Sequence, residues 1–228
     1  MNLLISDLDN TLGKNEKEIG EGIKLVLKYH NICDICFITG RSLTSLLPFE
    51  ELFIANTYLS PWGGGNLLKK ISIRKYAIVD DFERYTDFNI FSDLTYLFIP
   101  DTRIISFEDE IKLMNFDSLT DNNLQCVGAY RQVNNSAKLN SLNKGLDGLF
   151  FQIFTAFDNP RLNLIKKLSL KKSYSKIIYI GDDYCDINCI DFVDHFIAPI
   201  ESIASKNTKS IKFVTHENLE NILNLLIT

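Results

Sequence analysis

The chain has 228 residues, of which 46% are hydrophobic and 23% are charged, and its formal net charge at pH 7 is −5. This length allows one good core, or one core plus a smaller lobe. The negative charge argues against nucleic acid or an anionic membrane as a partner, and no apolar run reaches the roughly 18 residues of a membrane helix. Five cysteines, an odd number, do not indicate a disulfide framework. We therefore expect a cytoplasmic protein with reduced thiols, and the oligomeric state is left open.

The first third of the chain alternates between strand and helix patterns. An apolar run over residues 3–8 predicts a short buried strand that delivers two aspartates. Residues 17–30 have helical spacing, and residues 32–40 form a second strand-like run. Residues 42–53 begin as a helix that Pro48 interrupts.

The same alternation returns near the end of the chain. The pattern predicts a helix over 160–168, a strand over 176–183, short strands over 194–199 and 210–215, and an amphipathic helix over 217–227. Strands that alternate with helices favour a mostly parallel sheet covered on both faces. Ligands of such sheets bind beyond the carboxyl ends of the strands.

The middle of the chain breaks this rhythm. It holds strand-like runs over 124–133 and 149–157 and a predicted helix around 88–98. So long a stretch is too long for one structureless connection. We therefore predict an α/β, Rossmann-like parallel-sheet core and an inserted α+β cap domain, with the core formed by 1–66 and 158–228 and the cap by 67–157.

Acidic and polar residues follow three of the predicted strands. The first strand delivers Asp7 and Asp9, which lie two residues apart and so share one face of a strand. Two negative charges that lie so close together need a cation, a shared proton or a role in a reaction to account for them. Thr-Gly-Arg-Ser follows the second strand at 39–42, and Gly-Asp-Asp-Tyr-Cys-Asp follows a later strand at 181–186. Each fragment alone is a weak indication of function, but the three fragments together, in this order and each after an apolar run, form a specific pattern.

These three fragments resemble the motifs of the haloacid dehalogenase (HAD) superfamily, whose members are mainly Mg²⁺-dependent phosphatases. The matching pieces are DLDNT at 7–11, TGRS at 39–42 and GDDYCD at 181–186. An insertion after the second motif resembles the subgroup of Cof-type sugar phosphatases and sucrose-phosphate phosphatase. The resemblance implies the HAD fold with an inserted cap.

Phosphoryl transfer explains why these residue types are needed. Asp7 suits the nucleophile, because an aspartyl-phosphate divides one hard displacement into two steps. Asp9 would protonate the leaving oxygen and then activate water. The Thr39 hydroxyl and the main-chain N–H groups of Gly40 and Arg41 would bind phosphoryl oxygens. The Arg41 side chain has an alternative role as a surface charge that pairs with a carboxylate.

A metal ion would neutralise the carboxylates. Asp7, Asp182, Asp186 and the main-chain carbonyl of Asp9 supply the hard oxygen ligands that suit a six-coordinate Mg²⁺. Asp183 is expected to act as a helix cap or to lie outside the ligand set. Mg²⁺ is the expected cofactor.

Related phosphatases carry a lysine before the last motif that neutralises the nucleophile and the phosphate. Lys144 matches their Asn-Lys-Gly wording but lies well upstream of the expected helix. That helix begins with Asn159 as N-cap, Pro160 as its first residue and Arg161 as its second. We predict that Arg161 takes the place of the lysine. The alternative is that Arg161 is solvated and that the site lacks this cation or uses Lys144.

The predicted function is Mg²⁺-dependent hydrolysis of a phosphomonoester, with a small phosphorylated metabolite such as a sugar phosphate as substrate. The alternatives are a phosphomutase and a catalytically weak protein that binds phosphate or metal and regulates a partner. The sequence does not name the substrate. Arg74, Arg84, Arg103 and Arg131 are candidates for a second anionic group or are surface charges, and Trp62 either stacks on a sugar or belongs to the core.

Overall fold

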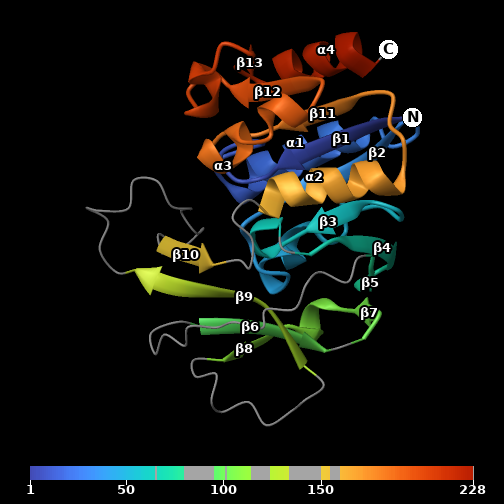
Figure 1. Cartoon of the computed structure of the whole chain (residues 1–228), viewed down its shortest axis with the longest axis vertical. Helices are drawn as coiled ribbons and strands as arrows, with labels where there is room; N and C mark the ends of the chain where they lie inside the picture. Colours follow the sequence, from blue (N-terminus) through green and yellow to red (C-terminus); the bar gives the residue numbers. More distant parts are fainter. Residues whose placement is uncertain are drawn as a thin grey trace.

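The computed structural model describes residues 1–64, 66–79, 95–100, 102–113, 124–133, 150–154 and 160–227. Within these residues the chain forms a nine-stranded sheet and a separate four-stranded sheet (Figure 1). No helix in this part of the chain combines the length and the apolar character that crossing a membrane requires.

The nine-stranded sheet has the order β13-β12-β11-β1-β2-β3-β4-β5-β7. Its strands are β1 (Asn2–Asp7), β2 (Cys33–Ile38), β3 (Tyr58–Ser60), β4 (Leu68–Ser72), β5 (Lys75–Ile78), β7 (Ile104–Ile105), β11 (Ile177–Ile180), β12 (His195–Pro199) and β13 (Ser210–Phe213). The strands from β13 to β3 are parallel, and β4, β5 and β7 continue the sheet in antiparallel fashion. The predicted mostly parallel α/β sheet is confirmed.

Helices cover both faces of the parallel strands (Figure 1). The α-helices are α1 (Glu16–Leu27), α2 (Pro160–Lys171), α3 (Tyr184–Ile187) and α4 (His216–Ile227). Short 3-10 helices are η1 (Thr44–Phe49), η2 (Trp62–Gly64), η3 (Phe107–Asp109), η6 (Ile190–Phe192) and η7 (Ala204–Lys206). α1 and α4 pack into one hydrophobic cluster, and α2 packs into the other.

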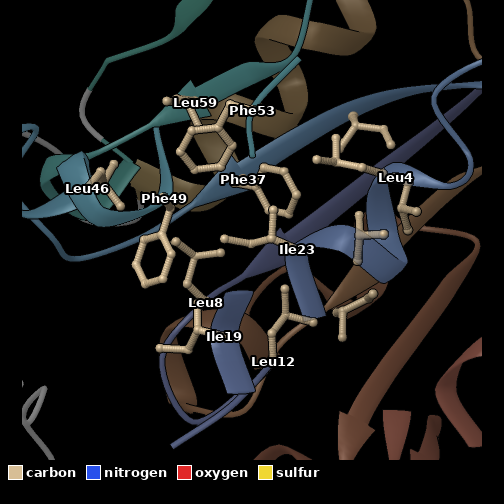
Figure 2. Packing of buried hydrophobic residues seen from close by; sticks show 14 of the residues in the cluster. Leu4, Leu8, Leu12, Ile19, Ile23, Phe37, Leu46, Phe49, Phe53 and Leu59 are labelled. Atoms are coloured by element: carbon tan, nitrogen blue, oxygen red, sulfur yellow. The ribbon is translucent and has the colours of Figure 1, made fainter. Parts of the chain in front are cut away.

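Alternation along the central strands produces these two clusters. Leu4 of β1 and Phe37 of β2 belong to the cluster under α1, whereas their neighbours Ile5 and Cys36 belong to the cluster under α2. Successive strand residues point to opposite faces of a sheet, so a strand that is apolar throughout is covered on both faces. Figure 2 shows the first cluster, in which Ile23 of α1 lies beside Phe37. The result is a three-layer core.

The four-stranded sheet has the order β10-β9-β6-β8, and its strands pair in antiparallel fashion. Its strands are β6 (Thr95–Pro100), β8 (Ile111–Leu113), β9 (Leu124–Val133) and β10 (Phe150–Phe154). All four fall within 67–157, the range predicted as the cap. β4, β5 and β7 fall in that range too, but they pair with the nine-stranded sheet. The division into domains stays a prediction.

One predicted element is wrong where it can be compared. The helix expected around 88–98 overlaps β6, which begins at Thr95, and residues 88–94 lie outside the described residues. β6 pairs with β8 on one side and with β9 on the other. This two-sided pairing, together with β-branched and aromatic residues in the sequence TYLFIP, outweighs the helical spacing.

Two leucines of α4 provide a test of the core. Leu223 is fully buried, whereas Leu225 in the same helix is 80% exposed. We expect Leu223→Ala to lower the free energy of unfolding by about 2–5 kcal/mol, because it removes buried contacts and leaves a cavity. Leu225→Ala is the matched control and should change it by less than about 0.5 kcal/mol. Urea denaturation measures both values, and equal losses would contradict the packing of α4.

Candidate active site

The carboxyl ends of three neighbouring strands form the site. β1 lies between β11 and β2, and it pairs in register with both: Ser6 with Ile180, and Asp7 with Ile38. Because the three strands are parallel, the segments that follow them leave the sheet at the same edge. The three sequence motifs are therefore brought together.

Asp7 is the last residue of β1, and its side chain is buried. The chain then turns through Asn10, which has a φ of 59° in the left-handed region that asparagine tolerates. The turn ends at Gly13. Glycine is needed at this position, because a Cβ atom there would lie 2.5 Å from the main chain of Ile19. This turn returns the Thr11 hydroxyl to the carboxylates: it donates to Asp182 at 2.6 Å and lies 3.3 Å from Asp7.

The last motif folds tightly around Asp186. Gly181 is required there, because a Cβ atom on it would lie 2.4 Å from the Asp186 carboxyl carbon. Asp186 is fully buried, and its carboxylate accepts from the main-chain N–H groups of Asp182 and Asp183 at 3.0 and 3.1 Å. The carboxylate of Asp183 accepts in turn from the first turn of α3, so the predicted capping role of Asp183 is confirmed.

Arg161 lies among these carboxylates. Pro160 is the first residue of α2, as predicted, and Arg161 is the second. Its guanidinium is buried, donates to Asp7 Oδ1 at 3.3 Å through Nη2, and donates to Asp186 through Nη1. Asp183 lies 3.7 Å from Nη1. The predicted substitute for the lysine therefore lies beside the predicted nucleophile.

Tyr179 adds a further contact that the sequence did not indicate. It lies in β11, is fully buried, and donates its hydroxyl to Asp186 at 2.6 Å. Asp186 thus accepts from Tyr179, Arg161 and two main-chain N–H groups, which is about the capacity of a carboxylate. A metal ion that bound Asp186 directly would have to displace one of these donors.

Asp9 and Arg41 form a two-pronged ion pair. The Arg41 guanidinium donates to the two carboxylate oxygens of Asp9 at 2.9 and 2.7 Å, and its side chain is only 7% exposed. The Arg41 side chain therefore pairs with a carboxylate, as in the alternative given above, although it is buried and not on the surface. The Arg41 main-chain N–H donates to the Thr39 hydroxyl at 3.1 Å, and that hydroxyl lies 3.4 Å from Asp9. Gly40 lies between these residues, so the second motif faces Asp9.

Burial dominates the electrostatics of the carboxylates. It raises the pKa of Asp7 well above its ordinary value; Arg161 opposes this shift, and Asp182, Asp183 and Asp9 add to it. Burial also raises the pKa of Asp182 to about 6, against the hydrogen bond from Thr11. Burial disfavours the charge of Arg161, but Asp7 and its other neighbours outweigh burial and raise its pKa. The positive charge of Arg161 therefore does not fully offset the burial and the mutual repulsion of these carboxylates.

The donor set fits a hard divalent cation. One carboxylate oxygen from each of Asp7, Asp182 and Asp186 lies within 4.8 Å of the others. Oxygen ligands of this kind suit Mg²⁺. Asp7 and Asp182 retain the most capacity to bind it, because their oxygens accept fewer hydrogen bonds than those of Asp186.

Other residues named from the sequence are core or surface residues, or lie outside the described part of the chain. Trp62 is fully buried, which confirms its place in the core, and Arg74 and Arg103 are exposed. Lys144, Arg84 and Asn159 lie outside the described residues. The structure describes only the main chain of Arg131, in β9.

The crowding of carboxylates predicts a pH dependence of stability. Because folding raises the pKa of Asp182, the folded protein binds this proton more tightly than the unfolded chain does between the ordinary carboxyl pKa and about 6. The contribution of Asp182 therefore lowers stability as pH rises through that range. We expect Asp182→Asn to raise the thermal midpoint at pH 7 in chelator and to weaken stabilisation by Mg²⁺.

Asp191→Asn is the control for this measurement, because Asp191 is exposed and pairs with Lys209 away from the cluster. Thermal melts from pH 4 to 7, with chelator or with Mg²⁺, distinguish the two variants. If Asp182→Asn kept the pH profile and the Mg²⁺ response of the wild type, the electrostatic account of the cluster would be wrong.

Comparison with protein-family models and with curated protein sequences found no match. Solved structures do match over nearly the whole chain. A haloacid dehalogenase-like hydrolase from B. subtilis has a TM-score of 0.65 at 13% identity, covering 98% of this chain and 99% of its own. A second such hydrolase, from Bacteroides thetaiotaomicron, has a TM-score of 0.60 at 14% identity and covers 99% of each chain.

A phosphatase of the same superfamily, also from Bacteroides thetaiotaomicron, matches with a TM-score of 0.58 at 14% identity. The match covers 100% of this chain and 96% of the phosphatase. At these identities the likeness concerns the fold. The chain has the fold of the haloacid dehalogenase-like hydrolases.

Proposed function

We propose that the protein is a Mg²⁺-dependent phosphomonoester hydrolase of the haloacid dehalogenase superfamily. The observation that carries this proposal is the meeting of Asp7, Asp182 and Asp186 with the Arg161 guanidinium at the carboxyl ends of β1 and β11. Carboxylates beside a fixed cation suit a nucleophile that must approach a phosphoryl group. The likeness in fold to a phosphatase of this superfamily supports the same function.

Asp7 serves as the nucleophile. Its carboxylate oxygen attacks phosphorus, the bond from phosphorus to the leaving oxygen breaks, and an aspartyl-phosphate forms. Arg161, which lies 3.3 Å from Asp7, offsets negative charge on the carboxylate and on the incoming phosphoryl group. The Thr39 hydroxyl, which lies 3.4 Å from Asp9, and the main-chain N–H of Gly40 bind phosphoryl oxygens.

Asp9 serves as the general acid and base. It gives a proton to the leaving alkoxide and then takes a proton from the water that attacks the aspartyl-phosphate, which releases phosphate and regenerates Asp7. The two hydrogen bonds from Arg41 fix the orientation of the Asp9 carboxylate. Asp7 and Asp9 thus act on opposite sides of one phosphoryl group.

Asp7, Asp182 and the main-chain carbonyl of Asp9 would hold Mg²⁺, with Asp186 as a direct or an indirect ligand. The bound ion would supply positive charge that lowers the pKa of the carboxylates and neutralises the phosphoryl oxygens. The substrate is a small phosphorylated metabolite such as a sugar phosphate.

Hydrolysis of an aryl phosphate tests the proposal. We expect Mg²⁺-dependent release of inorganic phosphate, no detectable turnover by Asp7→Asn, and a loss of about 100-fold or more in kcat for Asp9→Asn, the usual scale for a lost general acid. Undiminished turnover in excess chelator would rule out the metal. A requirement for a sugar bisphosphate would identify a mutase.

The role of Arg161 is tested by comparing two cations. Arg161→Ala removes the charge beside Asp7, so kcat should fall by about 100-fold or more. Arg161→Lys should restore part of the loss, because it returns charge without the planar contact to both Asp7 and Asp186. Lys144→Ala is the comparison variant and should have a small effect. The opposite ranking would assign the cation to Lys144.

A further inference from the structure

Glu110 is a buried carboxylate outside the aspartate cluster. It comes immediately before β8, the strand through which the chain returns from β7 of the nine-stranded sheet to the four-stranded sheet (Figure 1). Its side chain is 0% exposed, and among the described residues the nearest cation, Lys112 Nζ, is 3.9 Å away. Buried carboxylates need close donors, so its hydrogen bonds identify what it holds.

The donors to Glu110 come from two short 3-10 helices, the start of η1 with its N-cap Leu43 and the start of η2. One carboxylate oxygen accepts from the main-chain N–H of Leu43 and from the indole N–H of Trp62 at 3.0 Å. The other accepts from the Thr44 hydroxyl at 3.0 Å. Leu43 and Thr44 directly follow residues 39–42, so Glu110 is anchored next to the second motif.

The helix η2, which begins at Trp62, binds the main chain of that motif. The Trp62 main-chain N–H donates to the carbonyl of Arg41, and the Gly63 N–H donates to the carbonyl of Thr39, both at 2.9 Å. These two bonds hold the carbonyls of residues 39 and 41. Glu110 therefore binds both the residues that directly follow the phosphate-binding segment and the tryptophan whose main chain binds that segment.

The Trp62 backbone is strained. Its φ is 56°, in the left-handed region that a bulky residue rarely adopts. Such a conformation persists only where the surroundings determine it fully, and it is found disproportionately at functional sites. Here the indole hydrogen bond to Glu110 and the main-chain bond to Arg41 determine it.

We propose that Glu110 is a positioning residue for the phosphate-binding segment 39–41. It acts through Trp62 and Thr44 to hold the Thr39 hydroxyl and the Gly40 N–H in the geometry that receives a phosphoryl group. Because Glu110 belongs to the segment that enters β8, it also links that geometry to the four-stranded sheet. The inference rests on the proposed phosphatase function.

The test compares two buried glutamates. Glu110→Gln keeps the shape but removes the charge that strengthens these hydrogen bonds. The control is Glu50→Gln, because Glu50 is equally buried but accepts from Lys70 and Arg74 instead. With an aryl phosphate, we expect Glu110→Gln to raise KM and the inhibition constant of inorganic phosphate at least about fivefold. The Mg²⁺ concentration for half-activation should not change.

Glu50→Gln should lower the thermal midpoint without changing either constant. If both variants shifted KM equally, or if neither did, Glu110 would be an ordinary structural residue. If Glu110→Gln does not fold, Thr44→Val removes a single hydrogen bond to Glu110. This variant should raise KM in the same direction, and an unchanged KM would overturn the proposal.

A fluorescence titration separates this inference from the proposed function. Trp62 is the single tryptophan of the chain, so its emission reports the contact with Glu110. We expect inorganic phosphate with Mg²⁺ to change the emission of the wild type in a saturable way, and Glu110→Gln to weaken that response. This readout needs no turnover: absent hydrolysis would overturn the proposed function, whereas a response identical in Glu110→Gln would overturn the role of Glu110.

Discussion

Holding the buried Asp7 and Asp186 and the partly buried Asp182 within 4.8 Å of one another requires positive charge and many hydrogen-bond donors, because like charges repel strongly away from water. Much of the local structure supplies these groups. The second residue of α2 supplies a guanidinium, and the tight turn at Gly181 aims two main-chain N–H groups at Asp186. The first turn of α2 and the end of β11 are therefore built around the carboxylates.

The parallel sheet made the main features of this arrangement predictable. A motif that follows a buried apolar run lies at the carboxyl end of a strand, and parallel neighbours bring such ends together. Asp7, Thr39 and Asp182 could be grouped from their positions after three such runs, without knowledge of the strand order. The start of α2 was also predictable, because proline favours the first helical position. The place of Arg161 beside the site was predicted from the resemblance to phosphatases that carry a lysine at the start of this helix.

Long-range side-chain partners could not be predicted in the same way. Glu110 and Leu43 are 67 residues apart, and no local pattern around either residue indicates that they meet. Tyr179 reads as one more apolar residue of a buried strand, yet its hydroxyl binds Asp186. The helix expected around 88–98 failed for a related reason. Pairing of β6 with strands that lie far away in sequence outweighs a local periodicity.

Charge accounting links the two arginines to the metal. When Asp9 is ionised it is matched by Arg41, so that pair is then neutral. The three candidate metal ligands Asp7, Asp182 and Asp186 share one guanidinium, that of Arg161, which also lies 3.7 Å from Asp183, so at least two negative charges remain when all of these carboxylates are ionised. A divalent cation offsets two of these charges, whereas a second lysine or arginine would offset only one. Arg161 also donates a hydrogen bond to Asp186, which leaves Asp7 and Asp182 as the carboxylates best able to bind the ion. Arg161, which we propose takes the place of the lysine, thus lies beside the proposed nucleophile Asp7 and also determines which carboxylate oxygens remain for the proposed Mg²⁺.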